Sequence, residues 1–207
     1  MKHTSFIAVE GPIGAGKTTL ATMLSAELDF PVMKEIVEEN PFLDKFYQNM
    51  DDYSFQLEMF FLCNRFKQLE DIAARYIDQG MPVISDYHIY KNLIFGERTL
   101  NGTKRDKYRE IYHVLTDDLA KPNIILYIRA SLETILSRIA RRGRPFEDDI
   151  SPAYLQQLIE DYDAAMAALA EREPSTIILT IDGDAIDFVE NEEHFRQIAA
   201  QLKELMQ

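Results

Sequence analysis

The segment Gly11-Pro12-Ile13-Gly14-Ala15-Gly16-Lys17-Thr18 has the residue types and spacing of a phosphate-binding loop. Glycines let the backbone turn its N–H groups toward a phosphate chain, and the dipole of a following helix favours negative charge there. A lysine at this place contacts the outer phosphates, and the hydroxyl after it is a ligand for Mg²⁺. A glycine-rich turn without function is the alternative, which the complete motif disfavours. The sequence predicts that ATP and Mg²⁺ bind at Gly11, Gly14, Ala15, Gly16, Lys17, Thr18 and Thr19.

Two acidic residues follow predicted strands close to this loop. Glu35 ends the apolar run 31–35, and Asp86 comes directly after the run 82–85. The carboxyl ends of parallel strands meet at one edge of a sheet, where ligands bind. Phosphoryl transfer to a hydroxyl uses one carboxylate to receive the proton and another near the metal. We expect Glu35 to be the base and Asp86 to share the metal with Thr18, although each could be an ordinary surface acid.

Four arginines fall within seven positions of this otherwise acidic chain: Arg138, Arg141, Arg142 and Arg144. Gly143 and Pro145 interrupt the helical pattern there, which favours a lid at about 141–150 over a continuous helix. Closed over the triphosphate, the lid arginines would neutralise charge that develops during transfer. The alternative is a solvated helix end, where cations are favoured by the helix dipole.

Short apolar segments rich in β-branched residues alternate with long helical patterns, which predicts an α/β fold. Five segments are expected to be strands: 6–9, 31–35, 82–85, 124–128 and 177–181. Helices are expected at 17–28, 52–79, 88–118, 131–141, 151–171 and 191–205. Near-continuous apolar strands between helices indicate a five-stranded parallel sheet with helices on both faces. We expect one domain over residues 1–207.

The predicted helix 52–79 carries an apolar stripe at steps of three and four residues. Glu58 and Arg65 are seven residues apart, so they lie about 20° from each other on the shoulder of this stripe. Because burial of an unpaired charge is costly, two charges beside a core-facing stripe either pair with groups elsewhere or extend to water, or else they line a polar pocket.

Composition narrows the classes of partner. The 207 residues carry a formal net charge of -13, which disfavours nucleic acid and anionic membranes as partners. There is one cysteine, Cys63, so no intrachain disulfide can form, and a reducing cytoplasm is expected. The chain has neither a long apolar run nor a basic start followed by one, so we expect no membrane span and no secretory signal.

Several segments, in consistent order from about residue 5 to residue 182, resemble the deoxyribonucleoside kinases. They are Glu35-Ile36-Val37, Tyr47, Tyr53-Ser54-Phe55-Gln56, Arg65, Tyr127-Ile128-Arg129-Ala130-Ser131 and Arg142-Gly143-Arg144. Residues 38–47 and 85–92 look most like the bacterial deoxyguanosine kinase branch. The resemblance implies a P-loop kinase fold, a homodimer formed through helices, and transfer of the ATP γ-phosphate to a deoxynucleoside 5′-hydroxyl.

The resemblance also implies roles for individual residues. Glu35 corresponds to the general base, and Tyr47 to the tyrosine that holds the 3′-hydroxyl. Glu58 stands where the family commonly has a base-reading glutamine, and Asn92 where an aspartate is frequent. A carboxylate can accept both N1–H and N2–H₂ of guanine, whereas an amide suits adenine better, and arginine pairs readily with guanine O6 or N7. With Arg65 beside Glu58, this favours guanine, unless Gln56 is the family glutamine; the two lie about 160° apart on the helix.

Two positions depart from the family pattern. Tyr87, which could stack on a base, follows Asp86 where an arginine is usual, so Lys91 or Arg98 would have to supply the cation. Ala153 stands where some members have a glutamate that holds the 3′-hydroxyl, and the candidates to replace it are Glu147, Asp148 and Asp149. Asp182 and Gly183 are expected near the adenine of ATP.

We therefore predict a cytoplasmic Mg²⁺–ATP-dependent purine deoxynucleoside kinase of nucleotide salvage, with deoxyguanosine favoured. The alternatives are a deoxyadenosine or broad-specificity member, a nucleoside monophosphate kinase, and a protein that senses ATP without transferring phosphate.

Overall fold

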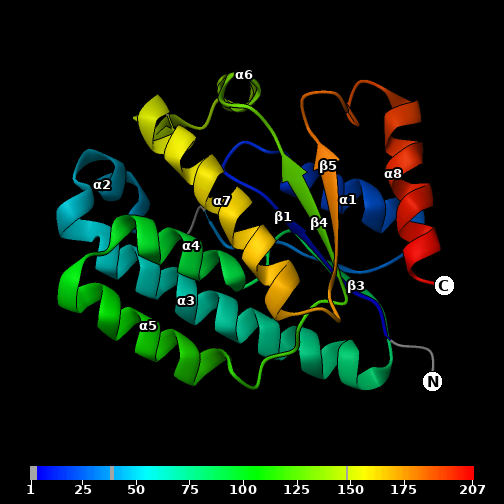
Figure 1. The fold of residues 1–207 in the computed structure, drawn as a ribbon, viewed down its shortest axis with the longest axis horizontal. Helices are drawn as coiled ribbons and strands as arrows, with labels where there is room; N and C mark the ends of the chain where they lie inside the picture. The colour runs from blue at the N-terminus through cyan, green and yellow to red at the C-terminus, as the bar shows by residue number, and fades with distance from the viewer. Residues whose placement is uncertain (1–3, 38–39, 148) are drawn as a thin grey trace.

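A computed structural model describes residues 4–37, 40–147 and 149–207. Five parallel strands form one sheet in the order β2-β3-β1-β4-β5 (Figure 1). The strands are β1 (Phe6–Glu10), β2 (Val32–Met33), β3 (Val83–Ser85), β4 (Ile124–Arg129) and β5 (Ile177–Asp182). The helices are α1 (Lys17–Leu28), α2 (Leu43–Gln48), α3 (Met50–Arg75), α4 (Tyr90–Thr99), α5 (Gly102–Thr116), α6 (Leu132–Arg142), α7 (Pro152–Arg172) and α8 (Glu192–Leu205), with short 3₁₀ turns η1 (Ile77–Gln79) and η2 (Pro145–Glu147). The predicted α/β class and parallel five-stranded sheet are confirmed.

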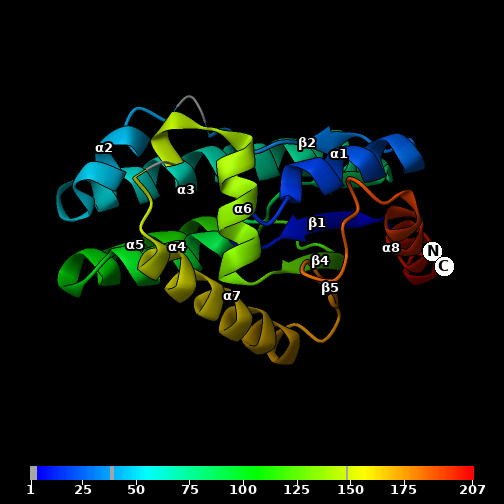
Figure 2. The same cartoon turned by 90° about the horizontal axis from the view of Figure 1, so that it is seen from above.

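Both faces of the sheet are covered because the central strands are apolar on both sides. Ile7 and Val9 of β1 pack with α1 and α8, whereas Phe6 and Ala8 face the helices on the other side. That second side holds α3, α4, α5, α6 and α7, and Figure 2 shows the sheet between α1 and α7. Among the described residues, no helix is both long and apolar enough to cross a membrane.

Two predicted elements differ from the structure. The second strand covers only Val32–Met33, because beyond it the N–H of Glu35 donates to the Asp86 side chain at 2.7 Å rather than to a strand carbonyl. The helical stretch predicted over 88–118 is two helices. The backbone is extended at Leu100, which is buried, and at Asn101, so the helix is interrupted there. The helix 52–79 ends at Arg75, and α2 was not predicted.

A glycine inside α4 sets how closely α5 packs against it. A Cβ added at Gly96 would lie 2.5 Å from the ring of Tyr108, which is buried and whose hydroxyl accepts from Asn92 at 2.8 Å. Alanine in place of a helical glycine normally stabilises by about 1 kcal/mol. We expect the opposite sign for Gly96→Ala, a loss of about 1–3 kcal/mol in the free energy of unfolding, because the ring cannot move away.

Urea unfolding measures this change, and Tyr108→Leu is the matched second variant. The double variant should be more stable than the sum of the two single changes predicts, because the smaller side chain makes room for the new methyl group. Additive losses would contradict the steric explanation.

Candidate active site

The phosphate-binding loop connects β1 to α1, as the motif predicts. Gly16 precedes the first turn of α1 with φ 101°, a left-handed conformation that suits glycine. The Nζ of Lys17 donates to the carbonyls of Gly11 and Pro12, at 2.8 Å each. Burial, together with the positive charge of Lys91, lowers the pKa of Lys17 to about 7. The Lys17 side chain therefore folds back onto the backbone of the phosphate-binding loop.

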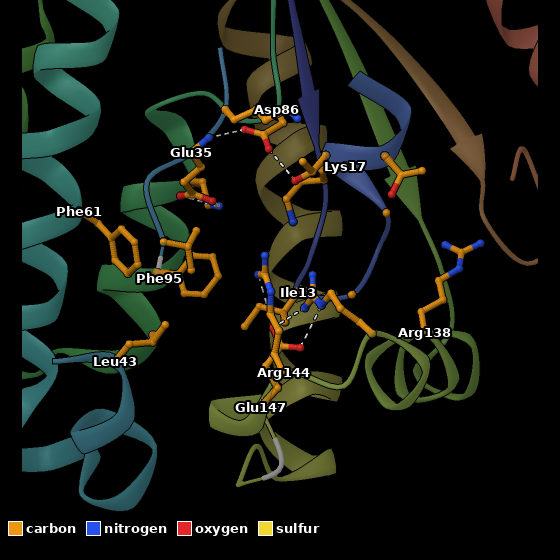
Figure 3. A pocket seen from close by; sticks show the side chains of 18 of the residues that line it. Ile13, Lys17, Glu35, Leu43, Phe61, Asp86, Phe95, Arg138, Arg144 and Glu147 are labelled. Atoms are coloured by element: carbon orange, nitrogen blue, oxygen red, sulfur yellow. Dashed lines mark hydrogen bonds and ion pairs between the residues drawn. The ribbon is translucent and has the colours of Figure 1, made fainter. Parts of the chain in front are cut away.

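Asp86 joins the phosphate-binding loop to Glu35. Its Oδ2 accepts from the Thr18 hydroxyl at 2.5 Å, and its Oδ1 accepts from the backbone N–H of Glu35 at 2.7 Å. Figure 3 shows Asp86 between the Lys17 region and Glu35. The ends of β2 and β3 thus bring the two predicted carboxylates together at one edge of the sheet, beside the start of α1.

The Glu35 carboxylate is held by two cations. Lys91 Nζ donates to its two oxygens at 2.9 and 3.1 Å, and Arg65 donates through Nε at 2.8 Å and also through Nη2. Burial alone would raise the pKa of Glu35, but Lys91 and Arg65 outweigh it and lower the pKa to about 2. Arg65 Nη1 also donates to Asn92 Oδ1 at 2.8 Å. Glu35 is therefore ionised across the neutral pH range, and Lys91, one of the two candidates for the cation, lies beside it in the pocket.

A second carboxylate, Glu58, lies further along the pocket on α3. Its side chain is buried, with 1% exposure, and its Oε1 accepts from the Thr99 hydroxyl at 3.0 Å. Its Oε2 has no hydrogen-bond partner among the described residues. Burial raises the pKa of Glu58 to about 7 against the opposing effect of Arg65. Glu58 and Arg65 both line the pocket, and each also pairs with a group on another element, Thr99 and Glu35 respectively, so both alternatives from the sequence apply.

Aromatic rings complete this end of the pocket. Phe61 and Phe95 project into it, on the side away from Arg138 (Figure 3). The Arg65 guanidinium lies 4.5 Å from the centre of the Phe61 ring. Tyr47 also lines the pocket, from α2. Flat apolar walls beside a buried carboxylate suit a planar heterocycle with hydrogen-bond donors on its edge.

Glu147 partly neutralises the positive charge of the arginine-rich segment. Arg142 Nε donates to Glu147 Oε2 at 3.0 Å, and Arg144 Nη1 lies 4.0 Å from Glu147 Oε1. Arg138 instead donates to the carbonyls of Ala15 and Gly183, at 2.8 Å each. All four predicted lid arginines, Arg138, Arg141, Arg142 and Arg144, line the pocket, and Arg138 also binds the backbone of the phosphate-binding loop and of the turn after β5.

These groups line one pocket of about 830 Å³ that runs from the phosphate-binding loop to the aromatic end. It has room for a triphosphate at one end and a nucleoside at the other, with Glu35 and Asp86 between them. A family model for deoxynucleoside kinases matches residues 7–207 of the chain.

The chain belongs to the deoxynucleoside kinase family.

Relatives and solved structures agree with this assignment. The chain is 60% identical to deoxyguanosine kinase of Bacillus subtilis strain 168, over all of both chains. It is 32% identical to the deoxyadenosine/deoxycytidine kinase of the same strain, over 77% of this chain and 75% of that one. A structure of deoxyadenosine kinase from M. mycoides with bound dATP superposes with a TM-score of 0.83 at 25% identity, over 96% and 99% of the two chains. The protein is a kinase that phosphorylates deoxynucleosides.

Three residues expected at the substrate of this kinase do not line the pocket. Gln56 is exposed on α3, so Glu58 is the residue of that pair that faces the pocket. Tyr87 is buried and its hydroxyl donates to Gln68 at 2.6 Å. Asn92 is buried behind Arg65 and acts on it rather than on the pocket. Asn92 therefore supports the pocket residue Arg65, whereas Tyr87 bonds to Gln68, which does not line the pocket.

Other expected residues of the kinase lie at the edge of the site. Asp182 and Gly183 do not line the pocket; Asp182 accepts from backbone N–H groups of its own turn, and the neighbouring segment 187–190 lines the pocket instead. Arg98 is remote, paired with Asp161 at 2.6 Å. Ala153 is exposed. Of its three candidate replacements, Glu147 lines the pocket, Asp149 is exposed, and Asp148 lies outside the described residues.

Sequence reasoning missed Phe61, Phe95 and Thr99. Phe61 lies between Glu58 and Arg65 at helical spacing, and Phe95 is one turn beyond Lys91. Those spacings placed them on the same helix faces as the charged residues. An aromatic at such a position is equally typical of a helix that packs on a core, so the pattern alone did not assign them to a pocket.

Proposed function

We propose that this kinase transfers the γ-phosphate of Mg²⁺–ATP to the 5′-hydroxyl of deoxyguanosine, as a step of nucleotide salvage. The preference for guanine is inferred from Glu58. This buried carboxylate lines the pocket, and its Oε2 has no partner among the described residues. The Watson–Crick edge of guanine presents two adjacent donors, which one carboxylate can accept together. The relative that is 60% identical is named for the same substrate.

The residues present fit Mg²⁺. A hydroxyl and a carboxylate, Thr18 and Asp86, lie together where the triphosphate enters, and Mg²⁺ is usually held by one or two such groups plus phosphate oxygens. Among the described residues, no cluster of three or more acidic, histidine or cysteine side chains could hold a metal without phosphates. When bound, the ion neutralises charge on the transferred phosphate.

The side chains of the chain supply orientation and charge. Glu35 accepts a hydrogen bond from the 5′-hydroxyl and receives its proton. Because Lys91 and Arg65 hold the pKa of Glu35 well below its ordinary value, Glu35 is ionised and can accept this hydrogen bond at neutral pH. Arg142 and Arg144 exchange Glu147 for phosphate oxygens, and Tyr47 with Glu147 lies where the sugar would bind.

A panel of acceptors at fixed Mg²⁺–ATP tests this proposal. It comprises deoxyguanosine, deoxyadenosine, deoxycytidine, thymidine and their 5′-monophosphates, with the products identified by mass. We expect the highest kcat/KM for deoxyguanosine. A higher kcat/KM for deoxyadenosine would support the alternative that the protein is a deoxyadenosine kinase, as some of its relatives are named. Phosphorylation of monophosphates alone would contradict a nucleoside kinase.

Glu58→Gln is the matched variant for the panel. Glutamine offers one acceptor and one donor, so guanine loses a hydrogen bond while adenine gains a complementary pair. We expect the preference for deoxyguanosine over deoxyadenosine to fall by about 10- to 100-fold, the size of one bidentate base contact. Gln56→Glu is the control, and because Gln56 is exposed the ratio should not change.

We also propose that the kinase acts in the cytoplasm as a homodimer formed through its helices. The single cysteine supports a reducing compartment. The mass in solution, measured by light scattering, distinguishes a monomer from a dimer.

A further inference from the structure

Glu58 and Thr99 form a hydrogen-bonded pair at the base end of the pocket, between α3 and the last turn of α4. The Thr99 hydroxyl lies 3.0 Å from Glu58 Oε1 and 2.9 Å from the backbone carbonyl of Phe95. Both of those oxygens can act as acceptors. The other carboxyl oxygen of Glu58 is buried, lies in a residue that lines the pocket, and has no partner among the described residues.

A threonine hydroxyl has one proton, so it cannot donate to Glu58 and to the Phe95 carbonyl together. When Glu58 is ionised, Thr99 donates to Oε1, and the Phe95 carbonyl keeps its helical bond. When Glu58 carries a proton on Oε2, the oxygen without a partner among the described residues, Thr99 still donates to Oε1, and the Oε2 hydroxyl can donate to a base. The pair can therefore hold Glu58 in either protonation state without leaving the hydroxyl unsatisfied.

The two protonation states read different base edges. An ionised carboxylate accepts from two adjacent donors, as on guanine N1 and N2. A protonated carboxyl has one O–H donor and one acceptor, which is the pattern of an amide and complements adenine N1 and N6. We propose that Glu58, positioned by Thr99, makes purine selection depend on one proton: the carboxylate selects deoxyguanosine and the carboxylic acid accepts deoxyadenosine. This inference rests on the proposed deoxyguanosine kinase activity and concerns its selectivity.

The groups around Glu58 keep its proton available near neutral pH. Arg65 from α3 and Lys91 from α4 both pair with Glu35, which compensates their positive charge. Tyrosines face it from three other helices: Tyr47 of α2, Tyr108 of α5 and Tyr154 of α7. All three have pKa values raised by burial, so they stay neutral. With burial as the main cause, the pKa of Glu58 rises to about 7.

The test is the ratio of kcat/KM for deoxyguanosine to kcat/KM for deoxyadenosine, measured across the neutral range. Ionisations common to both reactions, such as those of Lys17 and of ATP, cancel in this ratio. The ratio of ionised to protonated carboxyl changes tenfold with each pH unit. We expect the substrate ratio to rise with pH toward that slope, at most about 100-fold between about pH 6 and about pH 8. In Glu58→Gln the ratio should be independent of pH.

Thr99 has its own pair of variants. The Thr99 hydrogen bond is one of the interactions that lower the pKa of Glu58, so Thr99→Val should raise that pKa. We expect the substrate ratio to fall several-fold at every pH in Thr99→Val and to return to the wild-type value in Thr99→Ser, which keeps the hydroxyl. A purely structural role for Thr99 would lower kcat/KM for both substrates and leave their ratio unchanged.

Calorimetry in two buffers of different ionisation enthalpy gives a readout that does not depend on turnover. Near pH 7, deoxyguanosine should release protons on binding and deoxyadenosine should take them up, and Glu58→Gln should do neither. A flat substrate ratio in the wild type, or a pH-dependent ratio that persists in Glu58→Gln, would overturn the inference while leaving the kinase assignment intact. Failure to phosphorylate either purine deoxynucleoside would overturn both.

Discussion

Replacement of Glu35 by glutamine lowers kcat for deoxyguanosine by about 10²- to 10⁴-fold, the usual contribution of a positioned acid or base. Glutamine keeps the size of the side chain but cannot receive the proton of the 5′-hydroxyl. It also removes the negative charge that pairs with Lys91 and Arg65, whose distances to Glu35 are 2.9 and 2.8 Å. Single-turnover transfer from ATP measures the loss directly.

Binding of ATP is the control for this variant. The Glu35 side chain is not part of the phosphate-binding loop, and its contact with Asp86 is made by the backbone N–H, which the variant retains. We therefore expect the Kd for ATP to stay within a few-fold of the wild type. A fall in kcat of less than tenfold, with the protein folded, would contradict the role of Glu35 as the base.

Arg65→Met lowers the free energy of unfolding by about 3 kcal/mol, the low end for a broken buried ion pair, because it removes one of the two cations that hold Glu35 and leaves Lys91 as the other. The side chains of Arg65 and Glu35 are 4% and 10% exposed, so water cannot replace the lost partner. A loss of this size is a large fraction of the stability of an ordinary domain, which is about 5–15 kcal/mol. Denaturant unfolding at neutral pH gives the value.

The matched control is Arg98→Met. Arg98 and Asp161 also form a short ion pair, at 2.6 Å, but the side chains are 28% and 30% exposed. Pairs near the surface contribute about 0–1 kcal/mol, so this variant should be nearly neutral. Equal losses in the two variants would contradict the importance of burial.

The free energy of unfolding, measured as a function of pH, tests the Glu35 ion pair independently. The folded pKa of Glu35, about 2, lies below its ordinary value of 4.5, so its contribution to stability is present above pH 4.5 and is lost as pH falls through 2. The acid-dependent loss should be smaller in Arg65→Met, since that variant no longer holds the pKa of Glu35 as low.

Much of the site could be predicted because its positions are set by local sequence and by sheet topology. The glycines of the loop fix its backbone, and parallel strands bring Glu35 and Asp86 to the same edge. The choice between Glu58 and Gln56 needed the rotation of α3 relative to its neighbours, which no single helix determines. Only in the packed structure is Gln56 exposed and Glu58 buried.

The sequence also could not show whether a side chain lines the pocket or lies behind its wall. Tyr87 and Asn92 are on the predicted elements, but neither lines the pocket: Tyr87 donates to Gln68, and Asn92 accepts from the pocket residue Arg65. Phe61 and Phe95 read as core residues because burial in a core and contact with a flat ligand favour the same side chains. The break between α4 and α5 was missed for a similar reason, since Leu100 continues the apolar pattern and is buried.

The two backbone bonds of Arg138 have a consequence for the entropy of nucleotide binding. One guanidinium joins the carbonyl of Ala15 to that of Gly183, which are remote in sequence, and α6 carries it between them. The loop after β5 is thereby anchored to the phosphate-binding loop by contacts within the protein. Ordering such segments at the moment of binding would consume part of the interaction free energy. Arg138 therefore holds the ATP-binding part of the site in place. Less conformational entropy is then lost when ATP binds, and less of the binding free energy is spent on ordering these loops.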